Sequence, residues 1–338
     1  MNLLEFTEKG IYCEKADIYI DAWKPVDKVI VTHGHSDHAR WGSKHYLCHT
    51  DSDPIIRWRL GDDNTIESIG YDKPLMINGV KFSFHPAGHI IGSAQVKVEY
   101  KGETWVVSGD YKLENDGLST PFEPITCDVF ITESTFGLPV YKWKAQESVF
   151  AEINQWWQNN ANEGKASLLT GYSLGKAQRL LQGLNIAIGP VFVHGAIDNI
   201  NQVIASNGIK LKPYQRVNAD MKKDAFRKAL ILAPPSAANS PWVRRFQPLS
   251  LGIASGWMSL RGTRRRRAAD RGFILSDHAD WDGLNQAIQA TNAERIIITH
   301  GYRSIFARWL NENGYQATVE NTQFEGELSE IGESTLES

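Results

Sequence analysis

Residues 31–39 read VTHGHSDHA and place His33, His35, Asp37 and His38 within six positions, directly after the apolar run DKVIV. In an extended segment, residues two apart project to the same side, so His33 and His35 can reach one ion together. As the chain turns toward a helix, Asp37 and His38 face a neighbouring point. Imidazole and carboxylate are usual zinc ligands, and ions about 3.5–4 Å apart are typical of binuclear hydrolases. The cluster therefore predicts a metal site that can hold two ions; the alternative is a surface loop that binds metal adventitiously.

Four side chains cannot saturate two ions, so this cluster predicts further ligands downstream. His89 lies between two strand-like runs, Asp110 ends the run WVVSGD, and His300 ends the run RIIITH. Functional side chains gather where strands end, and a carboxylate at position 110 could bridge both ions. A lone histidine at such a position is usually structural. In combination with residues 33–38, these three positions become candidate ligands.

The order of sequence patterns predicts an α/β protein with one domain inserted in another. Residues 1–136 contain short apolar runs bounded by turn residues, with a Lys101-Gly102 hairpin signal. From residue 137, buried strand-like runs alternate with helical periodicity, which favours a parallel sheet. The first pattern returns with FILSDHA, a helix from Trp281 to about Asn292, and RIIITHGY. We therefore expect residues 1–136 and 274–322 to form one discontinuous domain, residues 137–273 a second, and the acidic residues 323–338 a disordered tail.

Composition narrows the class of protein. The net charge of −3 and pI of about 6.4 give no global signal for a nucleic-acid partner. Three scattered cysteines without CxxC spacing favour a reducing compartment. The beginning of the chain lacks the basic and apolar regions of a signal peptide, and no run of about 18 apolar residues is present. We expect a cytoplasmic protein that does not enter a membrane.

Together, these motifs resemble the metallo-β-lactamase superfamily and, within it, the β-CASP nucleases, over roughly residues 10–320. Asp21, after the run IYI, is similar to the superfamily's first motif, a residue that supports the ligand loop. Glu133 in ITESTFG, His278 in LSDHAD and His300 in ITHGY are similar to the three β-CASP motifs. The segment TGYSLGKAQRLL is similar to a helix start of the inserted domain. The resemblance implies an αββα sandwich with an inserted α/β β-CASP domain.

The same resemblance implies a site with two divalent ions, zinc or alternatively manganese. The first ion would be held by His33, His35, His89 and Asp110. The second would be held by Asp37, His38, Asp110 and His300. The residues implied in catalysis are His278, Glu133, Asp37 and Asp110. In the implied reaction a hydroxide bridging the ions attacks phosphorus, and His278, oriented by Glu133, gives a proton to the leaving sugar oxygen.

A narrower resemblance concerns the substrate. The segment SGWMSLRGTRRRRAADRGFILSDHADWDGL and the compact length are similar to bacterial ligase-associated DNA damage response exonucleases. This implies single-stranded or tailed DNA as substrate, a role in DNA repair, and functional association with an ATP-dependent DNA ligase and a helicase. Histidine at position 300 is typical of the RNA-cleaving groups, so an RNA endo- or exonuclease is the alternative. A small-molecule hydrolase would need neither the insertion nor His278, and an inactive scaffold would not need the full ligand set.

Two segments are candidates for binding the polymer. Between residues 255 and 272, one acid, Asp270, accompanies six arginines: Arg261, Arg264, Arg265, Arg266, Arg267 and Arg271. Guanidinium groups suit phosphate, although such a run can also be a solvated face. Ser173 and Lys176 lie at a helix start that can hold a phosphate, unless Ser173 simply caps the helix. For base stacking, the candidates are Trp257, Trp281 and Tyr172, if they are not part of the core.

Overall fold

The computed structural model describes residues 2–61, 63–260 and 269–324. By internal contacts, the chain divides into two units. The first contains the described residues up to Lys142 and those from Asp277 onward, and the second runs from Trp143 to Ser276. The α/β class expected from the sequence is confirmed, whereas the domain boundaries at residues 136 and 273 stay predictions.

The first unit contains two sheets. Strand order in one sheet is β1 (Glu5–Phe6), β2 (Ile11–Cys13), β3 (Ile18–Ile20), β4 (Lys28–Ile30), β5 (His45–His49) and β6 (Thr65–Ile69), with the pairs from β3 to β6 parallel. The order in the other is β19 (Gln316–Val319), β18 (Arg295–Gly301), β11 (Val129–Ser134), β10 (Glu103–Val107), β9 (Ala94–Tyr100), β8 (Val80–Pro86) and β7 (Leu75–Ile77). The β9–β10 hairpin turns at Lys101 and Gly102, both with positive φ as a two-residue type I′ turn requires.

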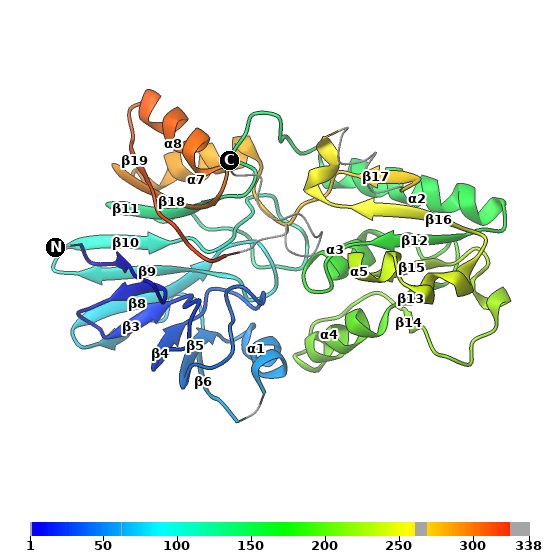
Figure 1. Ribbon diagram of the computed structural model, residues 1–338, viewed down its shortest axis with the longest axis horizontal. Helices are drawn as coiled ribbons and strands as arrows, with labels where there is room; N and C mark the ends of the chain where they lie inside the picture. The colour runs from blue at the N-terminus through cyan, green and yellow to red at the C-terminus, as the bar shows by residue number, and fades with distance from the viewer. Residues whose placement is uncertain (1, 62, 261–268, 325–338) are drawn as a thin grey trace. The chain divides into compact units, whose positions relative to one another are not determined.

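These two sheets face each other across one apolar core. Ile20 and Ile30 from one sheet pack with Phe82 and Val96 from the other. Each such buried side chain contributes about 1.5–3 kcal/mol relative to an exposed one. Helix α1 (Asp53–Leu60) covers the outer side of the first sheet, and α7 (Trp281–Thr291) and α8 (Arg303–Glu312) cover the outer side of the second (Figure 1). The layers of this unit are therefore helix, sheet, sheet and helix.

The second unit is a three-layer arrangement around a parallel sheet. Its strand order is β14 (Gln215–Arg216), β13 (Val191–Val193), β15 (Leu230–Ala233), β12 (Ala166–Thr170), β16 (Leu249–Ala254) and β17 (Arg271–Phe273). One face packs against α2 (Gln146–Asn162), α3 (Lys176–Gly183) and α4 (Gly195–Ser206). The other face is covered by α5 (Pro235–Ala238) and the short 3-10 helices η1 (Lys223–Phe226) and η2 (Pro241–Phe246), while a third, η3 (Gly256–Ser259), follows β16. The parallel sheet expected from the alternating pattern is confirmed.

Two expectations need correction. The run FILSDHA is not a strand through His278, because β17 ends at Phe273 and His278 lies in the loop that follows. Gln323 and Phe324 are expected from the sequence to belong to the disordered tail. Instead they contact the rest of the first unit, where the Phe324 ring packs edge-on against Trp23 and Gln323 O accepts from Arg40. The remainder of that tail lies outside the described residues. Among the helices of the described ranges, none combines the length and apolar character that a bilayer crossing requires.

Candidate metal centre

The loop that follows β4 is held by one buried carboxylate. Thr32 donates its backbone N–H to Asp21 Oδ1 at 2.8 Å and its hydroxyl to Asp21 Oδ2 at 2.6 Å. Asp21 adopts a positive φ of 46°, a conformation that aspartate tolerates better than most residues. These bonds turn the chain away from the sheet directly before His33, and Arg59 holds the next residue by donating to Gly34 O at 2.8 Å. Asp21 therefore supports the loop through Thr32, while the metal-supporting role that the resemblance implies for it stays a prediction.

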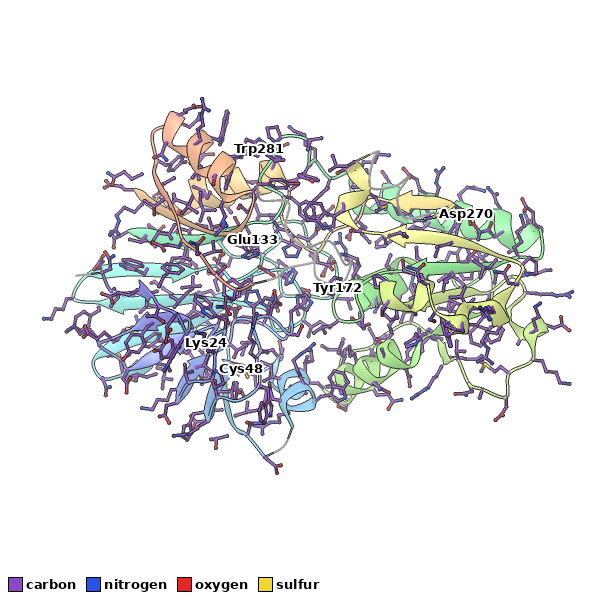
Figure 2. All side chains as sticks on the ribbon, viewed as in Figure 1. Lys24, Cys48, Glu133, Tyr172, Asp270 and Trp281 are labelled. Atoms are coloured by element: carbon purple, nitrogen blue, oxygen red, sulfur yellow. The ribbon has the colours of Figure 1, made fainter. Side chains whose placement is uncertain are left out.

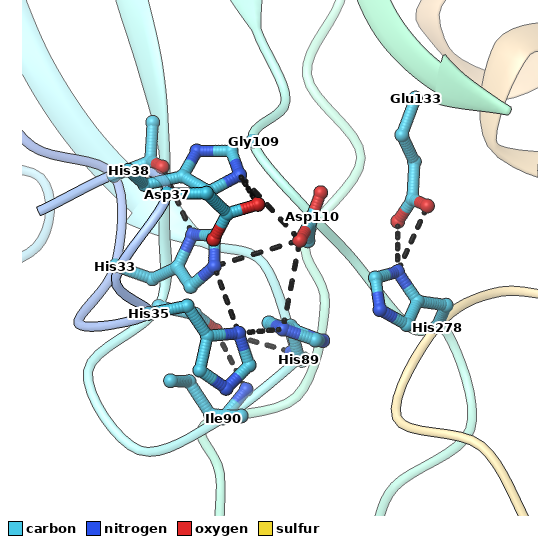
Figure 3. A network of polar contacts seen from close by, with 12 residues as sticks. His33, His35, Asp37, His38, His89, Ile90, Gly109, Asp110, Glu133 and His278 are labelled. Carbon is cyan, nitrogen blue, oxygen red and sulfur yellow. Dashed lines mark hydrogen bonds and ion pairs between the residues drawn. The ribbon is translucent and has the colours of Figure 1, made fainter. Parts of the chain in front are cut away.

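Four of the predicted ligands converge on one point. One ligand atom from each lies within 4.8 Å of every other in the set His33, His35, His89 and Asp110 (Figure 3). His35 Nδ1 lies 3.2 Å from His33 Nε2 and 3.1 Å from His89 Nε2. Asp110 Oδ2 lies 3.5 Å from His33 Nε2 and 3.8 Å from His89 Nε2. Three imidazoles and a carboxylate at such distances form a donor set that suits a divalent cation.

The position of Asp110 depends on the preceding glycine. Gly109 has a φ of 57°, and a Cβ at this residue would lie 2.8 Å from the Thr32 side chain. Only glycine fits this close approach without displacing Thr32. The approach brings the loop after β10 against the loop after β4, so Asp110 faces the histidines of the earlier motif.

A second group of ligand atoms also surrounds Asp110. His300, at the end of β18, has its Nε2 3.0 Å from Asp110 Oδ1, and His38 Nε2 lies 3.6 Å from Asp110 Oδ2. Asp37 Oδ2 lies 3.8 Å from His38 Nε2. Among the described residues, His38 Nε2, His300 Nε2 and Asp110 Oδ1 are buried atoms that make no hydrogen bond of regular geometry, although His300 Nε2 and Asp110 Oδ1 face each other as an ion pair. Because buried polar atoms are almost always satisfied, these three atoms fit a cation that they could share.

Partners on the far side of each ring fix which nitrogen faces the centre. His38 Nδ1 lies 2.7 Å from Asp21 Oδ2, and His89 Nδ1 lies 2.8 Å from the backbone carbonyl oxygen of Asp277. Thr299 Oγ1 lies 3.2 Å from His300 Nδ1. Metal-binding histidines commonly donate the other ring N–H in this way, which leaves the facing nitrogen free to coordinate.

The electrostatics of the two groups differ. Burial, reinforced by neighbouring histidines, lowers the pKa of His33 and of His89 well below the ordinary value, so both rings stay neutral. Burial alone would lower the pKa of His38, but the carboxylates of Asp37, Asp110 and Asp21 raise it to about 10. Burial also opposes ionisation of Asp110, whose pKa nevertheless falls well below its usual range because of His38 and His300. Positive charge is therefore favoured on the Asp37 side of the centre.

A carboxylate–imidazole pair adjoins these ligands. His278 Nδ1 lies 2.9 Å from Glu133 Oε2, and the two rings of His278 and His89 have centroids 4.6 Å apart. Glu133, at the end of β11 (labelled in Figures 2 and 3), also accepts from Tyr111 N at 2.8 Å and from Thr135 Oγ1 at 2.5 Å. With its oxygens held in this way, Glu133 fixes the tautomer of His278 that carries hydrogen on Nδ1 or on both nitrogens.

The predicted polymer contacts are less well placed. Arg261, Arg264, Arg265, Arg266 and Arg267 lie outside the described residues. Helix α3 begins at Lys176 with Gly175 as N-cap, so Ser173 is not the cap. Lys176 is buried and lies over the Tyr172 ring, with Nζ 5.6 Å from the ring centroid. Ser173 and Lys176 both belong to the second unit, and their role in binding a polymer stays a prediction.

The aromatic residues give a further correction. Trp257 and Trp281 are buried, so they cannot stack on bases without a change of structure. Sequence reasoning instead missed Trp41, whose side chain is 75% exposed in the loop after the histidine motif. It also missed the Asp277 carbonyl and the ring of Phe324, which stacks on His38. A backbone oxygen leaves no signal in the sequence, whereas a tryptophan next to the motif could have been noticed.

Comparison with known proteins supports the superfamily resemblance. No family model matches the chain. The chain is 32% identical over 314 residues to a probable DNA ligase of Opitutus terrae, a match covering 91% of this chain and 30% of the relative. It is 27% identical over 196 residues to endoribonuclease YSH1 of Candida glabrata, covering 46% of this chain and 25% of the relative. It is 28% identical over 218 residues to an RNase J-like protein of Methanocaldococcus jannaschii, covering 54% and 51%.

The chain thus spans only 25% to 51% of the length of these relatives. Among solved structures, a protein of unknown function from Enterococcus faecalis V583 has a TM-score of 0.61 at 12% identity, over 88% of this chain and 80% of that one. This is a likeness of fold alone. Two of the curated relatives are named as an endoribonuclease and an RNase J-like protein, and the His/Asp cluster of this chain suits a divalent metal.

Proposed function

We propose that the chain is a metal-dependent nuclease of the β-CASP group of the metallo-β-lactamase superfamily, which removes nucleotides from DNA ends during repair. One observation carries the proposal. Asp110 lies between two sets of imidazoles, with Oδ2 toward His33 and His89 and with Oδ1 toward His300. A carboxylate shared in this way is the arrangement that two adjacent cations require.

The residues present fit two divalent ions. His38 Nε2, His300 Nε2 and Asp110 Oδ1 are buried without regular hydrogen bonds, and these are the atoms that a cation would satisfy. One ion would be held by His33, His35, His89 and Asp110. The other would be held by Asp37, His38, Asp110 and His300. We propose zinc because imidazole with carboxylate suits it, with manganese as the alternative. When bound, such a pair activates water and neutralises charge on the phosphoryl group.

The chain's own residues contribute the proton for the leaving group. Glu133 engages Nδ1 of His278, and the proposed donor of a proton to the departing sugar oxygen is Nε2 of the same ring. A carboxylate partner also stabilises the protonated ring before transfer. A positioned general acid of this kind contributes about 10²–10⁴-fold to rate.

The fold arrangement supports the same family. The helix–sheet–sheet–helix layers of the first unit suit an αββα sandwich, and the parallel unit from Trp143 to Ser276 suits an inserted β-CASP domain. We therefore propose residues 1–136 and 274–322 as the sandwich and 137–273 as the insertion. A cytoplasmic location accords with the cysteine pattern.

DNA is the proposed substrate because of the ligase relative. A protein named as a probable DNA ligase aligns with 91% of this chain over only 30% of its own length. The aligned region accounts for less than one third of that protein, so a region similar to this chain and other regions share one polypeptide. This supports a role of the present chain beside an ATP-dependent DNA ligase. A helicase partner is proposed from the motif resemblance alone, and the arginine run is the proposed phosphate-binding surface.

An RNA-cleaving nuclease is the second candidate. Two relatives are named endoribonuclease and RNase J-like. Position 300 is a histidine, which is typical of the RNA-cleaving groups that the chain resembles.

Matched oligonucleotides distinguish the two. End-labelled single-stranded, duplex and tailed DNA are incubated beside RNA of the same sequence, with zinc or manganese added to metal-free protein. We expect stepwise shortening of DNA from one end. Stepwise or internal cleavage of RNA with DNA left intact would establish the alternative. Cleavage of neither polymer by protein containing two ions would overturn the nuclease proposal.

A further inference from the structure

The segment that follows β19 places an aromatic ring on a predicted metal ligand. The rings of Phe324 and His38 have centroids 4.3 Å apart and planes inclined by only 11°. Phe324 also lies edge-on to His300, at 5.7 Å and 80°, and edge-on to Trp23, at 5.6 Å and 82°. A single side chain therefore contacts both histidines of the second ligand group.

Hydrogen bonds on both sides hold this segment. Arg303 donates Nη1 to Asn321 Oδ1 at 2.6 Å and to Glu320 O at 3.2 Å. Arg40 donates Nη2 to Gln323 O at 2.5 Å and Nε to Asp37 O at 3.1 Å. Arg40 thus joins the histidine loop directly to the residue before Phe324.

The Phe324 ring restricts a rotation of the His38 ring that the hydrogen bond to Asp21 still allows. One hydrogen bond at Nδ1 fixes one atom of the His38 ring, but the ring can still rotate about the line through that atom, since χ2 of histidine is broad. His33 lies on one side of His38 with a centroid distance of 4.2 Å, and Phe324 is the parallel neighbour. Contact with both neighbours restricts the tilt of His38 and hence the direction of Nε2.

We propose that Phe324 is a positioning residue for the second metal ion, and that Arg40 keeps it in place. The proposal rests on the two-ion centre of the proposed function, and not on which polymer is cleaved. Phe324 reaches the ion only through His38 and His300, so its effect belongs to affinity for one ion and not to the proton-transfer step. The ion held by His33, His35 and His89 lies outside its contacts.

Metal titration of Phe324 variants tests this. Metal-free native protein and Phe324→Ala are titrated with Zn²⁺ in competition with a chromophoric chelator, and the Co²⁺ spectrum reports coordination at each site. We expect the second ion to bind about tenfold more weakly in Phe324→Ala, within the ranges for lost ring stacking and for lost ligand support. The first ion should be unaffected within twofold. Phe324→Trp should retain native affinity, whereas Phe324→Leu should not.

A matched control is Tyr100→Ala. Tyr100 packs, like Phe324, at the margin of the core between the two sheets, but it lies at the hairpin end of β9. Its removal should leave both affinities unchanged. Arg40→Gln should also weaken binding of the second ion, through its bonds to both Gln323 O and Asp37 O. The double variant with Phe324→Ala should lose less than the sum of the two effects, because the Gln323 bond acts through the Phe324 ring.

These measurements distinguish a failure of the Phe324 proposal from a failure of the two-ion centre or of the proposed function. Native second-ion affinity in Phe324→Ala, equal weakening of both ions, or an equal effect of Tyr100→Ala would overturn the role of Phe324 while leaving the two-ion centre intact. A native protein that takes up only one ion would remove the centre itself, and with it this proposal. Two ions bound normally without cleavage of any nucleic acid would refute the proposed function and leave the positioning role standing.

Discussion

Replacement of Asp21 by asparagine is expected to weaken the second metal ion specifically. Asp21 Oδ1 accepts from Thr32 N, while Oδ2 accepts from Thr32 Oγ1 and faces His38 Nδ1. If the amide keeps its oxygen toward Thr32 N, its NH₂ group faces His38 Nδ1, which must then accept a hydrogen bond. The ring proton moves to Nε2, and Nε2 can no longer coordinate. If the amide turns the other way, its NH₂ group opposes the Thr32 N–H inside the protein.

The expected loss of affinity follows from the hydrogen bond between Asp21 and His38 that the substitution removes. A hydrogen bond to a charged group contributes about 1.5–3 kcal/mol, which at about 1.4 kcal/mol per tenfold is a factor of roughly 10–150 in affinity. Measured losses for residues that support histidine ligands are about 10–100-fold. We therefore expect the second ion to bind about 10–100-fold more weakly. The first ion should be weakened less, because Asp21 bears on His33 through the Thr32 hydroxyl, which donates to Asp21 Oδ2 and lies 3.0 Å from His33 Nδ1.

The assay is chelator competition on metal-free protein, with Asp17→Asn as control. Asp17 also has a positive φ, of 51°, and accepts one side-chain hydrogen bond, from Tyr12 Oη at 2.9 Å, but is exposed. The Asp17→Asn protein should bind both ions with native affinity. Native second-ion affinity in Asp21→Asn would refute the argument that this carboxylate selects the His38 tautomer.

Further predictions concern turnover and binding. His278→Ala should reduce turnover by about 10²–10⁴-fold while the metal content stays full. Adding Glu133→Gln to this variant should reduce turnover little further, since both residues act through one ring. If single-turnover rates showed that the two losses add, Glu133 and His278 would have separate roles. Trp41→Ala should weaken binding of single-stranded nucleic acid by about 5- to 150-fold if the exposed ring stacks on one base, and an unchanged Kd in fluorescence titration would exclude it. Neutralising Arg264 and Arg265 together should flatten the salt dependence of binding by about two counterions, and an unchanged slope would mark the run as solvated surface.

Local sequence patterns predicted the elements that position the centre. The apolar run before residue 31, the two-residue hairpin at Lys101 and the helix from Trp281 all follow from neighbouring residues. Helix α7 even has the expected signals, with Asp280 accepting from Gly283 N at 2.8 Å and Asn292 closing the helix with a positive φ. Periodicity and capping depend on neighbouring residues, so they can be recognised in the sequence alone.

The loop of His278 could not be predicted in the same way. The run FILS has the composition of a buried strand, but the backbone after Phe273 is used by other partners. Arg179 donates Nη1 to Ser276 O, and the carbonyl oxygen of Asp277 faces His89 Nδ1. These carbonyls are therefore unavailable to a strand ladder. Both partners are distant in the sequence, and composition gives no sign of them.

The two ligand groups differ in how much of the chain must fold before they exist. The first draws its side chains from residues 33–110, yet His89 is oriented by the Asp277 carbonyl, which comes after the whole second unit. The second group also needs β18, which pairs with β11 across a long connection, and the segment that ends at Phe324. Closing a longer loop costs more chain entropy, although the cost rises slowly with length. Neither site can therefore be complete in a chain that stops before Asp277, and binding of the second ion should report that the last strands have joined the sheet.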